Sequence, residues 1–173
     1  MKIAILSDTH HKSKKAQKAV ELLLSEGAEF FIHAGDVGEL STLELLKNSG
    51  KKYVAVYGNN DAHLVEYHNS YNLVKEPNYF KVANTKFKLM HLPFYMSADA
   101  EVVVFGHTHQ FEVAMQGSTL YLNPGEVCAR NKPVSECAML EVTPDDFFVT
   151  HYTRAKGAKE FDAKSFTFQR KKQ

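Results

Sequence analysis

The stretch Phe105–His109 carries two histidines, His107 and His109, whose spacing suits metal chemistry. Residues two apart in an extended segment project to the same side, roughly 6 to 7 Å apart. The two imidazoles could therefore reach two neighbouring metal ions more readily than share one. Such a pair of ions also needs carboxylate ligands, which must come from other parts of the chain.

Similar polar clusters occur elsewhere, each at or within one residue of the end of an apolar run of the kind found in buried strands. The runs are Ile3–Leu6, Phe30–Ile32, Tyr53–Val56 and Val102–Val104. The clusters that follow them are, in the same order, Ser7–His10, His33–Asp36, Gly58–Asp61 and Phe105–His109. Because open α/β sheets bind ligands at the carboxyl ends of parallel strands, we expect these groups to lie together. A hydrogen-bonded buried aspartate or a core histidine with a purely structural role explains any single cluster. That explanation must be assumed separately at every strand end.

The remaining pattern predicts an α/β fold in a single domain over residues 1–173. Amphipathic helices are predicted over Lys14–Leu24 and around Thr42–Lys47. Antiparallel strand pairs are predicted for Asn78–Ala83 with Lys86–Met90 (turning at Asn84-Thr85 and followed by His91), Phe111–Met115 with Thr119–Leu122, and Ala138–Val142 with Phe147–Tyr152. Two sheets packed face to face, with helices outside, account for these elements.

Composition excludes several classes of protein. The 173 residues are 44% hydrophobic and 24% charged, which is ordinary globular composition. A formal net charge of +1 provides no long-range field to attract nucleic acid, which we do not expect as a partner. No apolar run approaches the roughly 20 residues of a membrane span. Two cysteines without CxxC spacing and no secretory segment predict a cytoplasmic protein with two buried thiols.

The motifs Asp8-Thr9-His10, Gly35-Asp36, Gly58-Asn59 with Asp61, His91 and Gly106-His107-Thr108-His109 occur in the order and spacing of a known family. Together they resemble the calcineurin-like metallophosphoesterases, and most closely their small, capless bacterial and archaeal phosphodiesterases of the YfcE type. The resemblance runs from Met1 to about Val142. It implies a four-layer α/β/β/α sandwich, which agrees with the two sheets predicted above.

By this resemblance, one metal ion would be held by Asp8, His10, Asp36 and His109. The other would be held by Asp36, Asn59, His91 and His107, so that Asp36 bridges the two. These ligand types suit two divalent cations, with Mn²⁺ expected first and Fe²⁺, Zn²⁺ or Ni²⁺ as alternatives. The implied activity is a phosphodiesterase that cleaves a small phosphate ester by attack of metal-bound hydroxide. The residues expected to act in catalysis are Asp36, Asn59, Asn60, Asp61 and His107.

The chain also departs from the family pattern. Asn60 stands where many relatives have His and small relatives often have Cys, and an amide cannot act as a general acid at neutral pH. The segment His91-Leu92-Pro93 replaces a common His-Gly-His, and the short connection Leu92–Glu101 predicts a site that is open on that side. Glu126 stands where serine is frequent.

The main alternative is an interaction scaffold that keeps the fold without catalysis, as a retromer subunit resembles this family. Such a protein should have lost ligands, whereas every ligand position named above is intact. A nuclease of the same superfamily is a third hypothesis. The near-neutral charge and the absence of an aromatic and basic groove pattern in the sequence argue against it. For the oligomeric state, a homodimer is the base-rate expectation.

Overall fold

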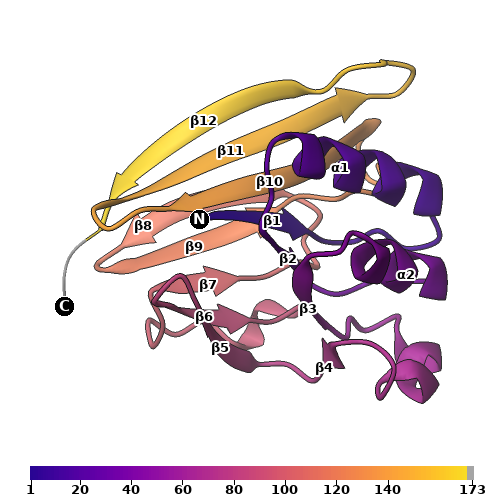
Figure 1. The fold of residues 1–173 in the computed structure, drawn as a ribbon, viewed down its shortest axis with the longest axis horizontal. Helices are drawn as coiled ribbons and strands as arrows, with labels where there is room; N and C mark the ends of the chain where they lie inside the picture. Colours follow the sequence, from indigo (N-terminus) through magenta and orange to yellow (C-terminus); the bar gives the residue numbers. More distant parts are fainter. Residues whose placement is uncertain (171–173) are drawn as a thin grey trace.

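The computed structural model describes residues 1–170, which form two stacked β-sheets and two α-helices (Figure 1). The larger sheet has the strand order β12-β11-β10-β1-β2-β3-β4. Its strands are β1 (Lys2–Leu6), β2 (Phe30–His33), β3 (Lys52–Val56), β4 (Leu73–Val74), β10 (Val134–Val142), β11 (Asp146–Ala155) and β12 (Asp162–Gln169). Of the predicted range 1–173, residues 171–173 lie outside the described part.

The smaller sheet has the strand order β5-β6-β7-β9-β8. Its strands are β5 (Asn78–Val82), β6 (Thr85–Leu89), β7 (Val102–Val104), β8 (Phe111–Gln116) and β9 (Thr119–Pro124). The helices are α1 (Ser13–Ser25) and α2 (Leu40–Asn48), with 3-10 turns η1 (Ala62–Tyr67) and η2 (Pro93–Tyr95). The predicted α/β fold with two sheets is confirmed.

Parallel strand pairing places the polar clusters on one side of the molecule. In the larger sheet, β1, β2 and β3 run parallel, with Ile5 opposite Ile32 and Ile32 opposite Val54. In the smaller sheet, β6 and β7 run parallel, with Leu89 opposite Val104. The loops after these five strands therefore project from the carboxyl ends of their sheets, as the sequence pattern predicts.

Apolar side chains from the facing surfaces of the two sheets form the main core. Ile3 and Ile5 on β1 pack in one cluster with Phe87 on β6 and Val104 on β7, and all are almost fully buried. Burying each such side chain contributes about 1.5 to 3 kcal/mol to folding. This core fixes the two sheets relative to each other and so sets the positions of the loops at their edges.

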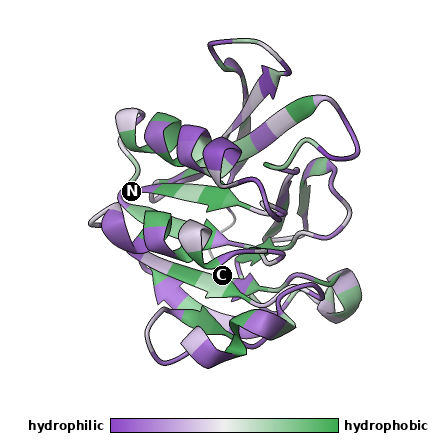
Figure 2. Ribbon diagram, turned by 90° about the vertical axis from the view of Figure 1, so that its right-hand side faces the viewer, coloured by the Kyte–Doolittle hydropathy of each residue, from purple (hydrophilic) through white to green (hydrophobic). Residues whose placement is uncertain are grey.

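Helices α1 and α2 cover the outer face of the larger sheet (Figure 1). Ala16, Ala19 and Leu23 recur at the spacing of one helix face and pack in a cluster with Phe31 of β2. Figure 2 shows the resulting alternation of hydrophobic and hydrophilic bands along the helices. Among the described residues, no helix is long and apolar enough to cross a membrane.

The outer face of the smaller sheet is covered differently from the expected fourth helical layer. In the part of the chain that the structure describes, residues 90–101 contain only the single 3-10 turn η2. Met90, Ala100 and Phe105 pack with Val103 of β7 in a small separate cluster. The connection is short, so a loop with one turn takes the place of a helix.

Several elements differ from those predicted. The hydrophobic periodicity of residues 62–77 is weak, and β4 and η1 in this segment were not predicted. The strand β12, which is mostly exposed, was not predicted either. The turn between β5 and β6 lies at Ala83 and Asn84, which both have positive φ, rather than at Asn84-Thr85. Those angles match the twist of a tight hairpin.

Candidate metal centre

Loops after five strands bring all seven predicted metal ligands together. Asp8 and His10 follow β1, Asp36 follows β2, Asn59 follows β3, His91 follows β6, and His107 and His109 follow β7. A cavity of about 340 Å³ is lined by His10, Asp36, Asn59, His107 and His109, together with Asn60, Arg130 and Asn131. Residues up to 101 positions apart in the sequence thus share one site, since the ligands span Asp8 to His109.

Strained backbone marks this site. Five of the seven residues have φ in the left-handed region: Asp8 (52°), His10 (46°), Asp36 (51°), His107 (67°) and His109 (60°). For residues other than glycine this conformation costs on the order of 1 to 3 kcal/mol each, and such residues cluster at functional sites. Long-range hydrogen bonds between main chains hold the loops, including His10 N–H to the Asp36 carbonyl at 3.0 Å.

Glycines allow the loops to approach one another. A Cβ atom on Gly58 would lie 2.1 Å from the backbone nitrogen of Asp36, and one on Gly106 would lie 2.1 Å from Ser7 Oγ. No side chain fits at either position, so the glycines that precede Asn59 and His107 are required for close packing of the loops.

One group of four ligand atoms surrounds a first potential metal position. His109 Nε2 lies 3.1 Å from Asp8 Oδ1 and 3.4 Å from His10 Nε2. His10 Nε2 lies 3.7 Å from Asp36 Oδ2. These separations are what a single ion needs when it is bound by two imidazoles and two carboxylates at about 2 Å from each donor.

A second group converges beside the first. Asn59 Oδ1 lies 3.0 Å from His91 Nε2 and 3.1 Å from His107 Nδ1, and His91 Nε2 lies 3.5 Å from Asp36 Oδ2. Asp36 Oδ2 therefore faces both groups. His91 Nδ1 donates a hydrogen bond to the Ala34 carbonyl oxygen at 2.8 Å, which leaves its Nε2 lone pair for a metal.

One carboxylate oxygen of Asp8 is buried without a hydrogen-bond donor, and this bears on whether the site fits a cation. Asp8 is fully buried, and its Oδ2 accepts hydrogen bonds from Ser7 Oγ and from the His107 backbone nitrogen. Its Oδ1 has no hydrogen-bond partner in the described residues and faces two imidazole nitrogens. A buried carboxylate oxygen without a donor is costly, and a cation in this position removes the cost. The donor set therefore fits a pair of divalent metal ions.

The pKa values of the carboxylates point the same way. Burial alone raises the pKa of Asp36, but hydrogen bonding and the charge of His91, with hydrogen bonds from Asn60, lower it below its ordinary range. In the metal-free protein, close contact with the Asp8 carboxylate raises the pKa of His109 to about 11, with a further contribution from Cys128. Negative charge at this site attracts a cation, either a proton or a metal ion.

Asn60 and Asp61 lie beside the ligand groups but differ in what they touch. Asn60 binds both oxygens of Asp36, through its backbone nitrogen (3.0 Å) and its Nδ2 (2.7 Å). Asp61 is fully buried and accepts hydrogen bonds from the backbone nitrogens of Val37, Gly38 and Gly58. Asn60 thus orients Asp36, whereas Asp61 ties together the loops after β2 and β3.

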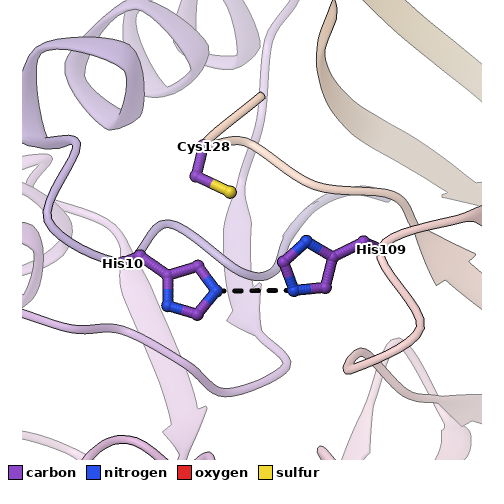
Figure 3. Close-up of side chains that lie close together, drawn as sticks. All are labelled: His10, His109 and Cys128. Atoms are coloured by element: carbon purple, nitrogen blue, oxygen red, sulfur yellow. Dashed lines mark hydrogen bonds between the residues drawn. The ribbon is translucent and has the colours of Figure 1, made fainter. Parts of the chain in front are cut away.

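The structure adds four residues that sequence reasoning did not place at the site: Glu126, Cys128, Arg130 and Asn131. Arg130 and Asn131 line the cavity, and Glu126 binds His109. Figure 3 shows the Cys128 sulfur directed toward the gap between the rings of His10 and His109; the potential ligand atoms of these three residues lie within 4.8 Å of one another. The sequence signal was Glu126 itself, which stands where serine is frequent in the family and lies in the loop that follows β9.

His33 lies close in sequence to the predicted ligand Asp36 but has a structural role. It is fully buried, and its Nε2 lies 2.9 Å from Thr9 Oγ1. It does not line the cavity. A polar residue at a strand end can therefore pack inside the molecule while the residues after it reach the site.

A larger cavity, of about 750 Å³, lies between the edges of the two sheets and away from the candidate ligands. Four lysines line it: Lys47, Lys51, Lys52 and Lys81. Apolar and aromatic side chains such as Phe80 complete its walls. The sequence order did not reveal this basic groove, because its lysines come from separate elements.

Comparisons with known proteins agree with the geometry. Residues 1–146 match the model of the calcineurin-like phosphoesterase superfamily domain. The chain is 28% identical over 160 residues to Phosphodiesterase MJ0936 of Methanocaldococcus jannaschii, which covers 85% of this chain and 96% of that protein.

Two solved structures share the fold. YfcE, a phosphoesterase from E. coli, superimposes with a TM-score of 0.70 and 22% identity over 95% of this chain and 98% of that one. Vacuolar Protein Sorting 29 from Cryptosporidium parvum superimposes with a TM-score of 0.78 and 19% identity over 98% of each chain. With the family match over residues 1–146, these findings show that the chain belongs to the calcineurin-like phosphoesterase superfamily.

Proposed function

We propose that this protein is a phosphodiesterase that holds two divalent metal ions and hydrolyses a small phosphate ester. The observation that carries the proposal is the position of Asp36 Oδ2, which lies 3.7 Å from His10 Nε2 in one ligand group and 3.5 Å from His91 Nε2 in the other. A single carboxylate oxygen facing two sets of donors is the arrangement of a bridged metal pair. The similarity to an archaeal phosphodiesterase supports the activity.

Residues around the proposed metal ions have different roles in the proposed reaction. Two divalent cations would supply Lewis acidity, which activates water and neutralises charge on a phosphoryl group. Asn60 fixes Asp36 through two hydrogen bonds, and Asp61 fixes the loops on either side. Arg130 lies at the rim of the cavity, where its guanidinium can bind a phosphoryl oxygen. His107 and Asn59 are exposed and so lie on the side from which a substrate enters.

The substrate preference follows from what Asn60 cannot do. Its amide has no proton to give to a leaving group at neutral pH, so the ester itself must supply a stable leaving group. We therefore expect diesters and aryl esters to be better substrates than alkyl monoesters. We propose that the short loop 92–101, which contains one 3-10 turn, leaves the site open on one side and so admits a substituent on both sides of the phosphorus.

The ligand set also bears on which metal is bound. Carboxylate, amide oxygen and imidazole donors suit Mn²⁺, Fe²⁺, Zn²⁺ and Ni²⁺, and we propose Mn²⁺ as the first choice. The buried Cys128 thiol beside His109 adds a softer donor than the sequence suggested. Comparison of the four metals is therefore part of the test.

The test measures hydrolysis of bis-p-nitrophenyl phosphate and p-nitrophenyl phosphate by chelator-stripped protein titrated with each metal ion. The variant Asp36→Asn should lower diester turnover at least about 100-fold, because a bridging carboxylate contributes several kcal/mol of charge stabilisation. Glu44→Gln, an exposed carboxylate on α2, is the matched control and should be unchanged. Equal activity of Asp36→Asn and the native protein would refute the proposal. Glycerol 1-phosphate, an alkyl monoester, is assayed beside the two aryl substrates, and a rate equal to that on bis-p-nitrophenyl phosphate would refute the role given to Asn60.

A second candidate function is a metal-binding interaction scaffold. Phe94, Tyr95 and Met96 are 76%, 49% and 41% exposed in the loop that follows His91, and exposed apolar clusters mark contact surfaces. Structures named for protein sorting share the fold. Metal binding without turnover of any phosphate ester would favour this function.

The setting of the protein is also proposed. Cys128 and Cys137 are both buried and unpaired, which supports a reducing, cytoplasmic location. The core shared by both sheets supports a single domain over residues 1–173. We propose a homodimer on base rates, and sedimentation equilibrium showing only the mass of one chain would refute it.

A further inference from the structure

Glu126 is a fully buried carboxylate that holds one predicted metal ligand from behind. Its Oε2 lies 2.5 Å from His109 Nδ1, on the side of the imidazole ring opposite to the ligand group. The other ring nitrogen, Nε2, lies 3.1 Å from Asp8 Oδ1 and 3.4 Å from His10 Nε2. Glu126 therefore contacts only the nitrogen of His109 that does not face the ligand group.

The hydrogen-bond donors around Glu126 make it the acceptor in its contact with His109. Its two oxygens accept hydrogen bonds from the backbone nitrogens of Asn131 and Lys132 at 2.8 to 3.1 Å, and Cys128 Sγ donates to Oε2 at 3.3 Å. A carboxylate with so many donors acts as an acceptor, so His109 Nδ1 must carry the hydrogen of the pair. A neutral imidazole with a hydrogen on Nδ1 has its lone pair on Nε2.

We propose that Glu126 is a positioning residue that accepts the Nδ1–H of His109 and thereby aims the Nε2 lone pair of His109 at the first metal position. This inference rests on the proposed metal pair. A carboxylate behind a metal-bound histidine fixes the orientation of its ring and makes the ligand more basic. His91 is held in the same way by the Ala34 carbonyl oxygen, so each metal position has one histidine fixed from behind.

The same residue also shapes the rim of the cavity. By binding the backbone nitrogens of Asn131 and Lys132, Glu126 holds the loop that carries Arg130 against the site. A serine at position 126 is too short to bind His109 and both backbone nitrogens at once. The carboxylate therefore links the first metal position to the substrate side of the site.

The test compares metal binding by Glu126→Gln and by the native protein, with Glu136→Gln as the matched control. Glu136 is also a buried carboxylate paired with a histidine, His151, but it lies outside the ligand groups. A glutamine at position 126 keeps the size of the side chain but turns one acceptor into a donor, which then faces another donor. Titration with Mn²⁺, followed by calorimetry, should show one of the two affinities lowered about 10- to 100-fold in Glu126→Gln. Glu136→Gln should bind both ions as the native protein does.

A spectroscopic measurement on the native protein removes any dependence on how well the variant folds. In ¹⁵N-labelled protein loaded with Zn²⁺, imidazole correlations should place a proton on His109 Nδ1 and none on Nε2. A proton on Nε2, or unchanged affinities in Glu126→Gln, would overturn the role of Glu126 while leaving the metal pair intact. A native protein that binds no ion at all would overturn the proposed metal pair, and the role of Glu126 with it.

Discussion

At the scale of single residues, the candidate site depends on side chains that are aimed by their neighbours. Asp36 is held by Asn60, and His91 by the Ala34 carbonyl oxygen. Asp8 is held by Ser7 and by the His107 backbone nitrogen, which leaves Oδ1 directed at His109. Strained φ angles at five ligands show that the surrounding packing, rather than local preference, fixes these residues.

His33 yields a prediction about pH and stability. Burial lowers the pKa of His33 from its ordinary value near 6.5 to about 4, so the folded protein keeps this histidine neutral. The unfolded chain takes up the proton below about pH 6.5. The contribution of His33 is therefore complete above pH 6.5 and decreases as the pH falls toward 4, by at most about 1.4 kcal/mol per pH unit.

Urea unfolding between pH 4.5 and 7.5 checks this expectation. The free energy of unfolding should fall less steeply with decreasing pH in His33→Gln than in the native protein. His68→Gln, which removes an exposed histidine, is the control for the loss of a histidine side chain as such. If the unfolding free energy of His33→Gln changes with pH as steeply as that of the native protein, the burial of neutral His33 does not cause the pH dependence.

At the scale of elements, loops after five strands carry the predicted ligands, and a short loop, residues 92–101, follows His91. The loop 92–101 is held on the smaller sheet by Lys88 of β6, which is only 2% exposed. Lys88 Nζ lies 2.6 Å from Ser97 Oγ and 3.1 Å from Asp99 Oδ1, and Tyr79 donates a hydrogen bond to Asp99 Oδ2 at 2.6 Å. Polar contacts of Lys88 and Tyr79 with Ser97 and Asp99 thus attach this part of the loop to the smaller sheet, where a packed helix is absent from the described residues 92–101.

Asp99→Asn tests this attachment. The variant loses the charge that pairs with Lys88, and hydrogen bonds to charged groups contribute about 1.5 to 3 kcal/mol. We expect a loss of about 1 to 2 kcal/mol in unfolding free energy, because Asp99 is about half exposed, together with faster hydrogen exchange in residues 92–101. Asp162→Asn, on exposed β12, serves as the control. Native exchange rates in the loop of Asp99→Asn would show that other contacts hold it.

The sequence predicted those features of the fold and the site that are encoded by residues close together in the chain. Short apolar runs followed by Asp8, Asp36 and His107 predicted both the strands and the common position of the polar groups. Glu126 and Cys128 could not be predicted as neighbours of His109, because only the packing of the loop after β9 brings them there. The edge strands β4 and β12 were missed because exposed strands carry little hydrophobic pattern.

At the scale of the whole molecule, the two sheets meet so that parallel strands of both point their carboxyl ends toward one site. The larger sheet provides Asp8, His10, Asp36 and Asn59, and the smaller sheet provides His91, His107 and His109. Neither sheet holds all the predicted ligands for either of the two proposed metal positions. The apolar core between the sheets is therefore what assembles the site.

The most direct test of this account is anomalous X-ray diffraction from crystals of the native protein grown with Mn²⁺. We predict two anomalous peaks about 3.5 to 4 Å apart, with Asp36 Oδ2 between them. One peak should be bound by Asp8, His10 and His109, and the other by Asn59, His91 and His107. A single peak, or a metal ion bound without Asp36, would contradict a site in which the two sheets together hold a bridged pair of ions.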